Sequence, residues 1–322
     1  MKRRLLLPLL GGLFAAPVTV RAAFAWPDQP MKIVVPFTPG TGPDIIARFV
    51  AERLSPKVGQ PVVVENVAGA SGNIGSQQVA RARPDGTTLM SQVVTLVMNA
   101  SLYKNLPYDP VTDFAPIGLT AWGSLVLVAN PGQAPNTLAE FIAFAKAKPK
   151  SLNYGSPGVG TPHHLSMALV ETDAGIELTH VPYKGSAGAV QDLLGGQIGY
   201  MFLPVHVSAQ YIRAGKLKAL AVGSPKRLPQ LPDTPTLIEQ GLKGADVDMW
   251  YGLFAPKGTP ADVIDRLNRE TATILDAPGA RTIFEAQGLI PTTSTPVAFA
   301  DIVARDKARW ATIVTKRGIA AE

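Results

Sequence analysis

Short apolar runs alternate along the chain with segments in which apolar residues recur every three or four positions. Residues 33–35 and 62–64 are apolar runs typical of buried strands. The segment between them has helical spacing, with apolar side chains at Ile45, Ile46, Phe49, Val50 and Leu54. Further strand candidates occupy residues 125–129, 179–182, 198–202 and 219–222. This alternation predicts an α/β fold with mostly parallel sheets and helices on both faces.

Two helices are marked by their end residues. Thr161 followed by Pro162 is typical of an N-cap with proline at the first helical position. Ser186 is predicted to cap a second helix, which ends at Gly195. No linker-like composition separates parts of the chain, although its length suggests two domains. We therefore expect two lobes joined by crossings of the chain.

The N-terminus has the pattern of a secretory signal peptide. Lys2, Arg3 and Arg4 precede an uncharged apolar stretch at 5–20, and Ala23-Phe24-Ala25 supplies small residues for cleavage before Trp26. The alternative is a membrane anchor, but the stretch is shorter than the roughly 20 residues that span a bilayer. The sequence thus predicts that residues 1–25 are removed and that the mature protein works in the periplasm.

Charge and cysteine content exclude several functions. Losing the signal segment removes four basic residues and no acidic one, which lowers the formal net charge from +6 to +2. A nucleic-acid partner is therefore not expected. The chain has no cysteine, which excludes thiol catalysis and cysteine-ligated metals. A core of this size needs no disulfides.

Three loops rich in glycine and small hydroxyl residues each follow a predicted strand and lead into a predicted helix. Ligands of parallel α/β sheets bind at such strand ends, and backbone N–H groups at a helix start favour an anion. Without a ligand, the same glycines would serve only tight turns. The candidate binding residues in these loops are Gly40, Thr41, Gly42, Asp44, Ala70, Ser71, Gly72, Asn73, Ser156, Gly160 and Thr161.

Catalytic and metal-binding patterns are absent from the sequence. It contains no G-x-S-x-G, no Walker motif, no H-E-x-x-H and no G-x-G-x-x-G. His163 and His164 are adjacent, and neighbours on a helix point about 100° apart, so they are poor co-ligands of a metal. We expect one to line a cleft and the other to face solvent. Asp44 is a candidate general base, but its place near a helix start favours a loop-bracing role. No enzyme activity, cofactor or metal is predicted.

Several segments in order along the chain resemble the Bug-type periplasmic receptors of tripartite tricarboxylate transporters. They include Ile-Val-Val-Pro-Phe at 33–37 and Gly-Gln-Pro-Val-Val-Val-Glu-Asn at 59–66. The others are residues 72–75, 106–110, 160–165, 180–185, 192–197, 214–217 and 250–253. The resemblance runs from about Trp26 to the C-terminus.

The resemblance implies a type II periplasmic-binding-protein fold, in which two lobes close on a ligand like a Venus flytrap. Residues 26–124 and 250–322 would form lobe 1, and residues 125–249 lobe 2. The ligand would be a small organic carboxylate, and the partners of this expected monomer would be membrane transporter subunits. His164, Leu203 and His206 complete the expected ligand-binding set. Leu203 stands where many family members have aspartate, so a ligand ammonium would lack a partner and the far end of the ligand could be apolar or aromatic.

Two other functions remain open on the same fold. A receptor of this kind can present its ligand to a sensor kinase, and an enzyme can use the same hinged closure. The enzyme alternative lacks a nucleophile–base pair in the sequence.

Overall fold

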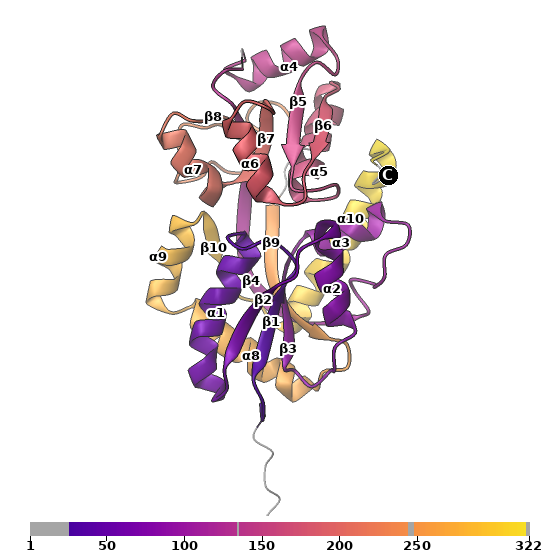
Figure 1. Cartoon of the computed structure of the whole chain (residues 1–322), viewed down its shortest axis with the longest axis vertical. Coiled ribbons are helices and arrows are strands. Elements are labelled where there is room, and N and C mark those ends of the chain that lie inside the picture. Colours follow the sequence, from indigo (N-terminus) through magenta and orange to yellow (C-terminus); the bar gives the residue numbers. More distant parts are fainter. Residues whose placement is uncertain (1–25, 134, 244–247, 320–322) are drawn as a thin grey trace, which may run out of the picture.

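The computed structural model describes residues 26–133, 135–243 and 248–319. The expected signal peptide, residues 1–25, lies outside the described residues. Figure 1 shows an elongated molecule with two α/β lobes stacked along its long axis. In the described ranges, no helix is both long and apolar enough to cross a membrane.

The lower lobe in Figure 1 contains the first strands of the chain and its last helices. Strand β1 (Met31–Val35) pairs in parallel with β2 (Val62–Asn66) and β3 (Thr88–Val93). Strand β9 (Asp248–Pro256) is antiparallel to β3 and to β4 (Phe114–Ala129), which also pairs with β10 (Leu289–Pro291). The helices here are α1 (Gly42–Val58), η1 (Ala70–Gly72), α2 (Asn73–Ala80), α3 (Thr95–Leu102), α8 (Ala261–Leu275), α9 (Pro278–Ala286) and α10 (Pro296–Arg317).

The upper lobe is formed by the middle of the chain. The end of β4 is antiparallel to β7 (Tyr200–Pro204) and β8 (Lys218–Val222). Strand β5 (Asn153–Ser156) is parallel to β7 and to β6 (Thr179–Pro182). The helices of this lobe are α4 (Leu138–Ala147), α5 (Pro162–Ala174), α6 (Ser186–Leu194) and α7 (Val205–Arg213).

Strand β4 runs through both lobes. Its residue Ser124 is paired with Asp248 of β9, and the next residue, Leu125, is paired with Pro204 of β7. Because β4 carries the chain into the upper lobe and β9 carries it back, the two strands are antiparallel neighbours. The expectation of mostly parallel sheets is therefore wrong. Among the named strands of the described residues, parallel pairs are limited to β1 with β2 and β3, and β5 with β6 and β7.

The helix starts follow the sequence closely, with one correction. Thr161 is the N-cap of α5, as predicted. Ser186 is not a cap but the first residue of α6, because Gly185 takes the N-cap position with φ 137°. A side chain rarely adopts that φ, so the glycine allows the chain to turn sharply into α6.

Strand β7 is buried on both faces, and each face packs in a different apolar cluster. Tyr200 and Phe202 belong to the large core that extends through both lobes. Met201 and Leu203 belong to a smaller cluster with α6 and α7. This burial fixes the end of β7, and therefore the start of α7, at the junction of the lobes.

Candidate ligand-binding cleft

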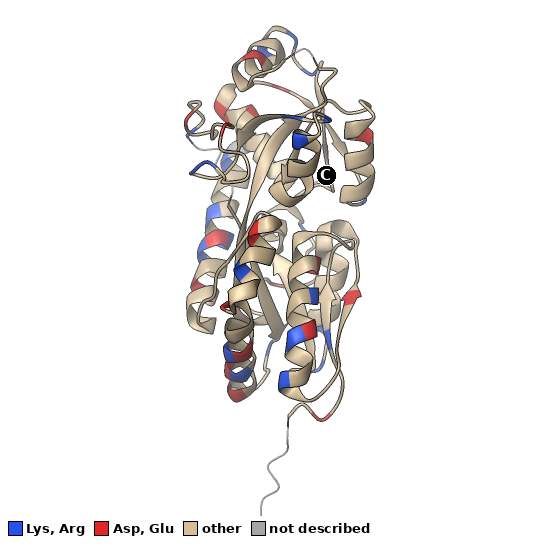
Figure 2. Ribbon diagram, turned by 90° about the vertical axis from the view of Figure 1, so that its left-hand side faces the viewer, with Lys and Arg blue, Asp and Glu red and all other residues tan. Residues whose placement is uncertain are grey.

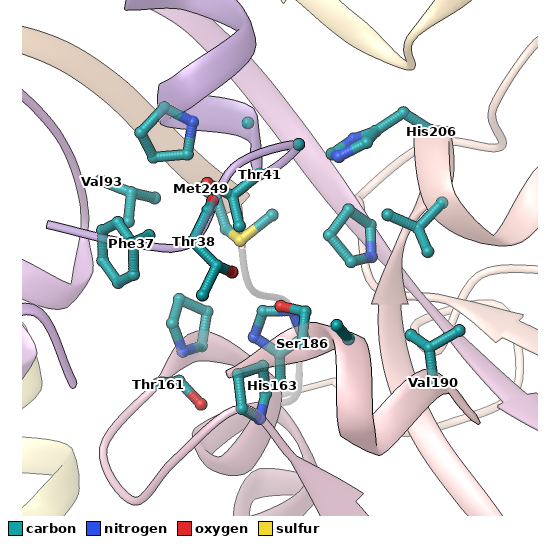
Figure 3. A pocket seen from close by; sticks show the side chains of 18 of the residues that line it. Phe37, Thr38, Thr41, Val93, Thr161, His163, Ser186, Val190, His206 and Met249 are labelled. Atoms are coloured by element: carbon teal, nitrogen blue, oxygen red, sulfur yellow. Dashed lines mark hydrogen bonds between the residues drawn. The ribbon is translucent and has the colours of Figure 1, made fainter. Parts of the chain in front are cut away.

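A cleft with two compartments lies where the lobes meet. The larger, which we call the main compartment, has a volume of about 510 Å³, in the range of roughly 300–1,000 Å³ typical of small-molecule sites. Figure 3 shows side chains from both lobes pointing into it. Its lining consists of Phe37, Thr38, Pro39, Gly40, Thr41, Gly42, Pro43, Val93, Thr95, Pro157, Thr161, Pro162, His163, Ser186, Ala187, Val190, Gln191, Leu194, Pro204, His206, Val207, Tyr211, Met249 and Tyr251.

The smaller compartment, which we call the side compartment, has a volume of about 410 Å³. All three glycine-rich loops border it, through Thr38 and Thr41, residues 68–72, and residues 157–159 with Thr161. Lys184 adds one cation. It shares a wall with the main compartment, formed by Phe37, Thr38, Thr41, Pro157, Thr161 and Ser186. The two compartments are therefore adjacent.

Four helices begin at the main compartment. Its lining includes residues from the first turn of α1, α5, α6 and α7. The first N–H groups of a helix have no acceptor within the helix and carry a partial positive charge. The described lining of both compartments contains no Asp or Glu, and Figure 2 shows the charged residues mainly on outer helices and loops. The cleft therefore favours an anion.

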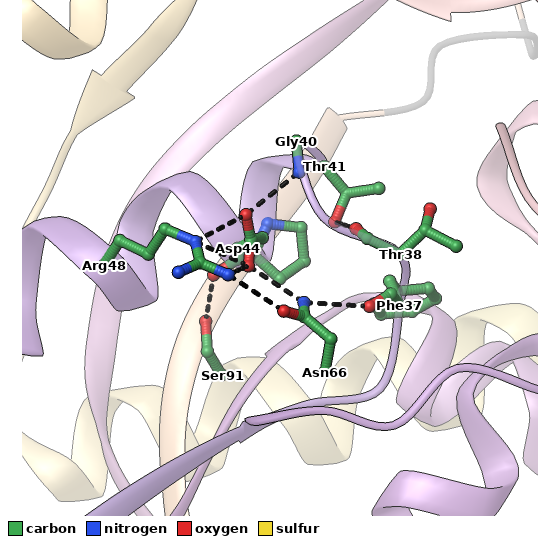
Figure 4. A network of polar contacts seen from close by, with 9 residues as sticks. Phe37, Thr38, Gly40, Thr41, Asp44, Arg48, Asn66 and Ser91 are labelled. Carbon is green, nitrogen blue, oxygen red and sulfur yellow. Dashed lines mark hydrogen bonds and ion pairs between the residues drawn. The ribbon is translucent and has the colours of Figure 1, made fainter. Parts of the chain in front are cut away.

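Asp44 braces the first loop rather than lining the cleft. Its carboxylate accepts hydrogen bonds from Gly40 N at 2.9 Å, Asn66 Nδ2 at 2.9 Å and Arg48 Nε at 3.0 Å (Figure 4). Burial on its own would raise the pKa of Asp44, but these hydrogen bonds and the charge of Arg48 outweigh it and hold the pKa below its usual value. The contacts agree with the loop-bracing alternative and give Asp44 no access to a ligand in either compartment.

The hydroxyl groups on the shared wall fall into two kinds. Thr41 Oγ1 donates to Thr38 O at 2.9 Å, and Thr161 Oγ1 donates to Gly158 O at 2.7 Å, so their protons hold the loops in shape. The side-chain hydroxyls of Thr38 and Ser186 have no hydrogen-bond partner among the described residues and point into the cleft (Figure 3). They are the hydroxyl donors available to a ligand at this wall.

The adjacent histidines lie in different environments, and neither faces solvent. His163 lines the main compartment, and both of its ring nitrogens are buried without a partner. His164 does not line the cleft or face solvent: its Nδ1 accepts from Gly160 N at 3.2 Å, and its ring stacks on His180 with centroids 4.2 Å apart. The expectation for His164 is wrong because the side of α5 that carries His164 packs against Tyr154 and His180. The neighbouring side of the helix, which carries His163, therefore faces the cleft.

The other candidate residues divide into lining and supporting positions. Gly40, Thr41, Gly42, Thr161 and His206 line the main compartment, and Thr41, Thr161, Ala70, Ser71 and Gly72 line the side compartment. Ser156 and Asn73 support these loops from behind. Ser156 Oγ bonds His180 Nε2 at 2.7 Å, and Asn73 Oδ1 accepts from Asn99 Nδ2 at 2.6 Å. Gly160 likewise lies outside the described lining.

Leu203 does not have the position that the sequence suggested. Its side chain is fully buried in the smaller apolar cluster, on the face of β7 opposite to Phe202. The next residue, Pro204, lies at the cleft instead. Because successive side chains of a strand point to opposite faces, the position of Leu203 is set by the sheet and not by the ligand.

Two hydrogen bonds join the lobes beside the cleft. Ser71 Oγ donates across it to Val159 O at 2.6 Å, and Gln230 Nε2 donates to Glu285 O at 2.7 Å. Ser71 has a left-handed backbone, with φ 53° and ψ 36°, a strained conformation for a residue with a side chain. The closing hydrogen bond thus comes from a strained residue beside the side compartment.

In the described ranges, no group of three or more His, Asp or Glu side chains is placed to hold a metal ion.

The sequence of residues 46–319 matches the protein-family model described as tripartite tricarboxylate transporter family receptor. The chain belongs to this family. Bordetella pertussis BugT is 36% identical over 94% of this chain and 93% of its own length. A UPF0065 protein of Pseudomonas sp. (strain P51) is 37% identical over 98% of this chain and 94% of its own length.

Solved structures of similar proteins have the same two-lobe binding fold. The periplasmic binding protein BugD has a TM-score of 0.86 at 37% identity and covers 92% of this chain with 99% of its own. An R. palustris protein with adipate has a TM-score of 0.87 at 34% sequence identity. The match covers 92% of this chain and 99% of that protein's chain. MatC from Rhodopseudomonas palustris with bound malate has a TM-score of 0.85 at 32% sequence identity. The match covers 90% of this chain and 100% of MatC. These family members are binding proteins, and two of them hold carboxylates.

Sequence reasoning missed several lining residues of this TctC-type receptor. Thr38 lies three residues after the end of the first strand, and Ser186 begins a helix, so their places after a strand and at a helix start were available signals. Lys184 lies within the family-like segment 180–185 and carries no other signal in the sequence. Met249 enters the cleft from the returning strand β9, whose pairing with β4 has no signature in local sequence.

Proposed function

We propose that the chain is a receptor that captures a small organic carboxylate in the periplasm and delivers it, as a monomer, to the membrane subunits of a tripartite tricarboxylate transporter. The observation that carries this proposal is the convergence of the first turns of α1, α5, α6 and α7 on a cleft with no acidic side chain in its described lining. A receptor that binds its ligand without catalysing a reaction agrees with the family, whose members are binding proteins.

The carboxylate end of the ligand belongs at the wall that the two compartments share. A buried carboxylate needs several donors, because an unpaired one is costly to remove from water. The hydroxyls of Thr38 and Ser186 and the amides at the starts of α5 and α6 supply neutral donors there. Pro43 and Pro162 have no N–H, so α1 and α5 each offer fewer amides than a helix start usually does.

Ligand capture requires the lobes to move about the crossing strands. We place the boundary of lobe 1 at Ser124 and Trp250, with lobe 2 formed by residues 125–249. The change of partner strand along β4, from β9 at Ser124 to β7 at Leu125, supports this division. Secretion through a cleaved segment 1–25 also belongs to the proposal, and a mature N-terminus at Trp26 on periplasmic protein would support it.

The hydroxyl donors give a direct test of the carboxylate site. Thr38→Val and Ser186→Ala should each weaken carboxylate binding by roughly 1.5–3 kcal/mol, the usual contribution of a hydrogen bond to a charged group. Thr312→Ala is the matched control, because Thr312 is an exposed hydroxyl of α10 that bonds Ala308 O. Calorimetry with a co-purified ligand identified by native mass spectrometry measures the effect. Unchanged affinity in both cleft variants would remove the carboxylate from this wall.

A further inference from the structure

Strand β9 places the phenol ring of Tyr251 at the main compartment. Successive side chains of a strand point to opposite faces. Met249 and Tyr251 therefore share one face of β9, and both line the compartment. Trp250, between them, is buried in the core and donates from Nε1 to Asp306 Oδ2 at 2.9 Å. Figure 3 shows Met249 pointing into the compartment, which is the side that Tyr251 also faces.

The ring of Tyr251 fits between two glycines. A Cβ atom at Gly42 would lie 2.6 Å from Tyr251 Cε1, and one at Gly123 would lie 2.8 Å from Tyr251 Cε2, both too short for a real contact. Neither glycine has a positive φ, so the backbone does not require glycine at these positions. The missing side chains leave the space that the ring fills, and the ring is held in one place.

The hydroxyl of Tyr251 has no hydrogen-bond partner among the described residues, although the residue is only 2% exposed. The hydroxyl of Tyr200 is also unpaired, but it is sealed in the core and lines neither compartment. That of Tyr251 is not sealed, and it borders the main compartment. Burial raises the pKa of Tyr251, so its hydroxyl keeps the proton at physiological pH. An unpaired donor in a buried place is costly, which points to an acceptor supplied from the cleft.

The start of α1 lies beside this hydroxyl. Gly42 is the first residue of α1, and a Cβ atom there would lie 2.8 Å from the hydroxyl oxygen of Tyr251. The N–H of Gly42 has no acceptor among the described residues, and the first N–H groups of a helix carry a partial positive charge. Two neutral donors on neighbouring elements suit an oxygen that accepts hydrogen bonds.

This position differs from the wall proposed for the carboxylate. Gly42 and Tyr251 line the main compartment alone, whereas Thr38 and Ser186 line both compartments. An oxygen beside Tyr251 is therefore a second acceptor on the ligand, separate from the carboxylate at the shared wall.

We propose that Tyr251 is a specificity-determining residue, whose hydroxyl donates to a second oxygen acceptor of the ligand at the start of α1. This inference rests on the proposed function for the first carboxylate. The second oxygen belongs to a ketone carbonyl or to a second carboxylate, because both accept hydrogen bonds. An alkyl or unsubstituted phenyl end would leave the hydroxyl unpaired.

A matched ligand series tests the inference by calorimetry at pH 7. Each plain acid, which has one carboxylate and no other oxygen, is compared with two acids that carry a second acceptor. The sets are pentanoate with 4-oxopentanoate and glutarate, hexanoate with 5-oxohexanoate and adipate, and benzoate with 4-acetylbenzoate and terephthalate. In at least one set, an acid with the second acceptor should bind about tenfold more tightly than the plain acid, from the added hydrogen bonds. The oxo acids and the diacids distinguish the two sources of the oxygen.

Tyr251→Phe shows whether the hydroxyl carries this preference. Phenylalanine keeps the ring between Gly42 and Gly123 and removes only the donor. The preferred acid should therefore lose about tenfold in affinity, and the plain acid of its set much less. Tyr200→Phe is the matched control, because it removes an unpaired, buried hydroxyl that lies outside the cleft. It should keep both affinities.

The outcomes separate this inference from the proposed function. If no acid with a second acceptor binds better than its plain acid, the inference is overturned and the carboxylate receptor stands. A preference that survives in Tyr251→Phe also overturns it. So does an equal loss for both acids in that variant, since the hydroxyl would then act on the first carboxylate. If pentanamide, hexanamide and benzamide bind as tightly as the plain acids, the carboxylate site itself is wrong.

Discussion

At the scale of single residues, the buried position of Glu171 controls its protonation. It lies on α5, and its Oε1 accepts a hydrogen bond from Leu178 N at 2.7 Å. Burial, with a smaller contribution from the charge of Glu177, outweighs the opposing hydrogen bond from Leu178 and raises the pKa of Glu171 to about 7. The folded protein therefore holds this proton at pH values where the unfolded chain has lost it.

The raised pKa predicts a pH-dependent loss of stability. The stabilisation from the bound proton is complete below about pH 4.5, the usual pKa of glutamate, and is lost as the pH rises through about 7. Glu171→Gln removes the titration and keeps an acceptor for Leu178. Its stability relative to wild type should therefore rise between pH 5 and pH 8 in denaturant unfolding. Glu52→Gln, at an exposed position of α1, is the control, and equal pH profiles for wild type and Glu171→Gln would contradict the assignment.

The buried position of Leu203 gives a second prediction at this scale. Leu203→Asp would place a carboxylate in the apolar cluster of β7, α6 and α7 rather than in the cleft. We expect a loss of more than about 3 kcal/mol of unfolding free energy, because the charge has no partner there. Leu203→Met, which conserves volume, should cost less than about 1.5 kcal/mol. A stable Leu203→Asp variant that gains affinity for an amino acid would restore the original interpretation of this position.

Some of these residue roles could be predicted from sequence, and others could not. Asp44 follows a glycine loop at a helix start, and that local context indicates a bracing role. The sequence also shows that His163 and His164 point in different directions, because they are adjacent on a helix. It does not show which one faces the cleft, since the rotation of α5 depends on packing against Tyr154 and His180.

At the scale of elements, the loop before α5 shows how a cap residue shapes the site. Thr161 is the N-cap of α5, but its hydroxyl donates to Gly158 O at 2.7 Å instead of accepting from the helix. The sequence predicted the start of this helix because threonine followed by proline is a local signal. The bond within the loop could not be predicted, because it depends on the positive φ of the neighbouring glycines.

This bond predicts that Thr161→Ala weakens ligand binding by roughly 1 kcal/mol, the usual net contribution of one hydrogen bond. Thr161→Ser keeps the hydroxyl and should bind like wild type. Calorimetry on the two variants compares the effect of the bond with that of the methyl group. An alanine variant with wild-type affinity would show that the loop needs no brace.

At the scale of the whole molecule, closure depends on a tight contact between α9 of one lobe and α7 of the other. Gly288, after α9, has φ 65°, and a Cβ atom there would lie 1.4 Å from Val205 Cγ1. The division into two lobes was predictable from the family resemblance. This contact was not, because it joins segments more than 80 positions apart that meet only through the crossing strands.

Gly288→Ala should therefore hold the lobes apart. We expect a larger radius of gyration by small-angle X-ray scattering and at least a tenfold loss of ligand affinity, which is about 1.4 kcal/mol. Gly59→Ala is the matched control, because Gly59 has a similar φ of 75° and open space around it. It carries the same backbone cost without the clash. If the two variants have the same affinity and the same radius of gyration, the contact at Gly288 does not limit closure.

The central claim is that the cleft recognises a carboxylate with neutral donors and helix starts. The most direct measurement compares the calorimetric affinity of the wild-type protein for a bound acid and for its carboxamide, which has nearly the same shape without the charge. The account predicts that the acid binds at least about tenfold more tightly than the amide, because hydrogen bonds to a charged group contribute roughly 1.5–3 kcal/mol each. Equal binding of acid and amide, or tighter binding of the amide, would contradict it.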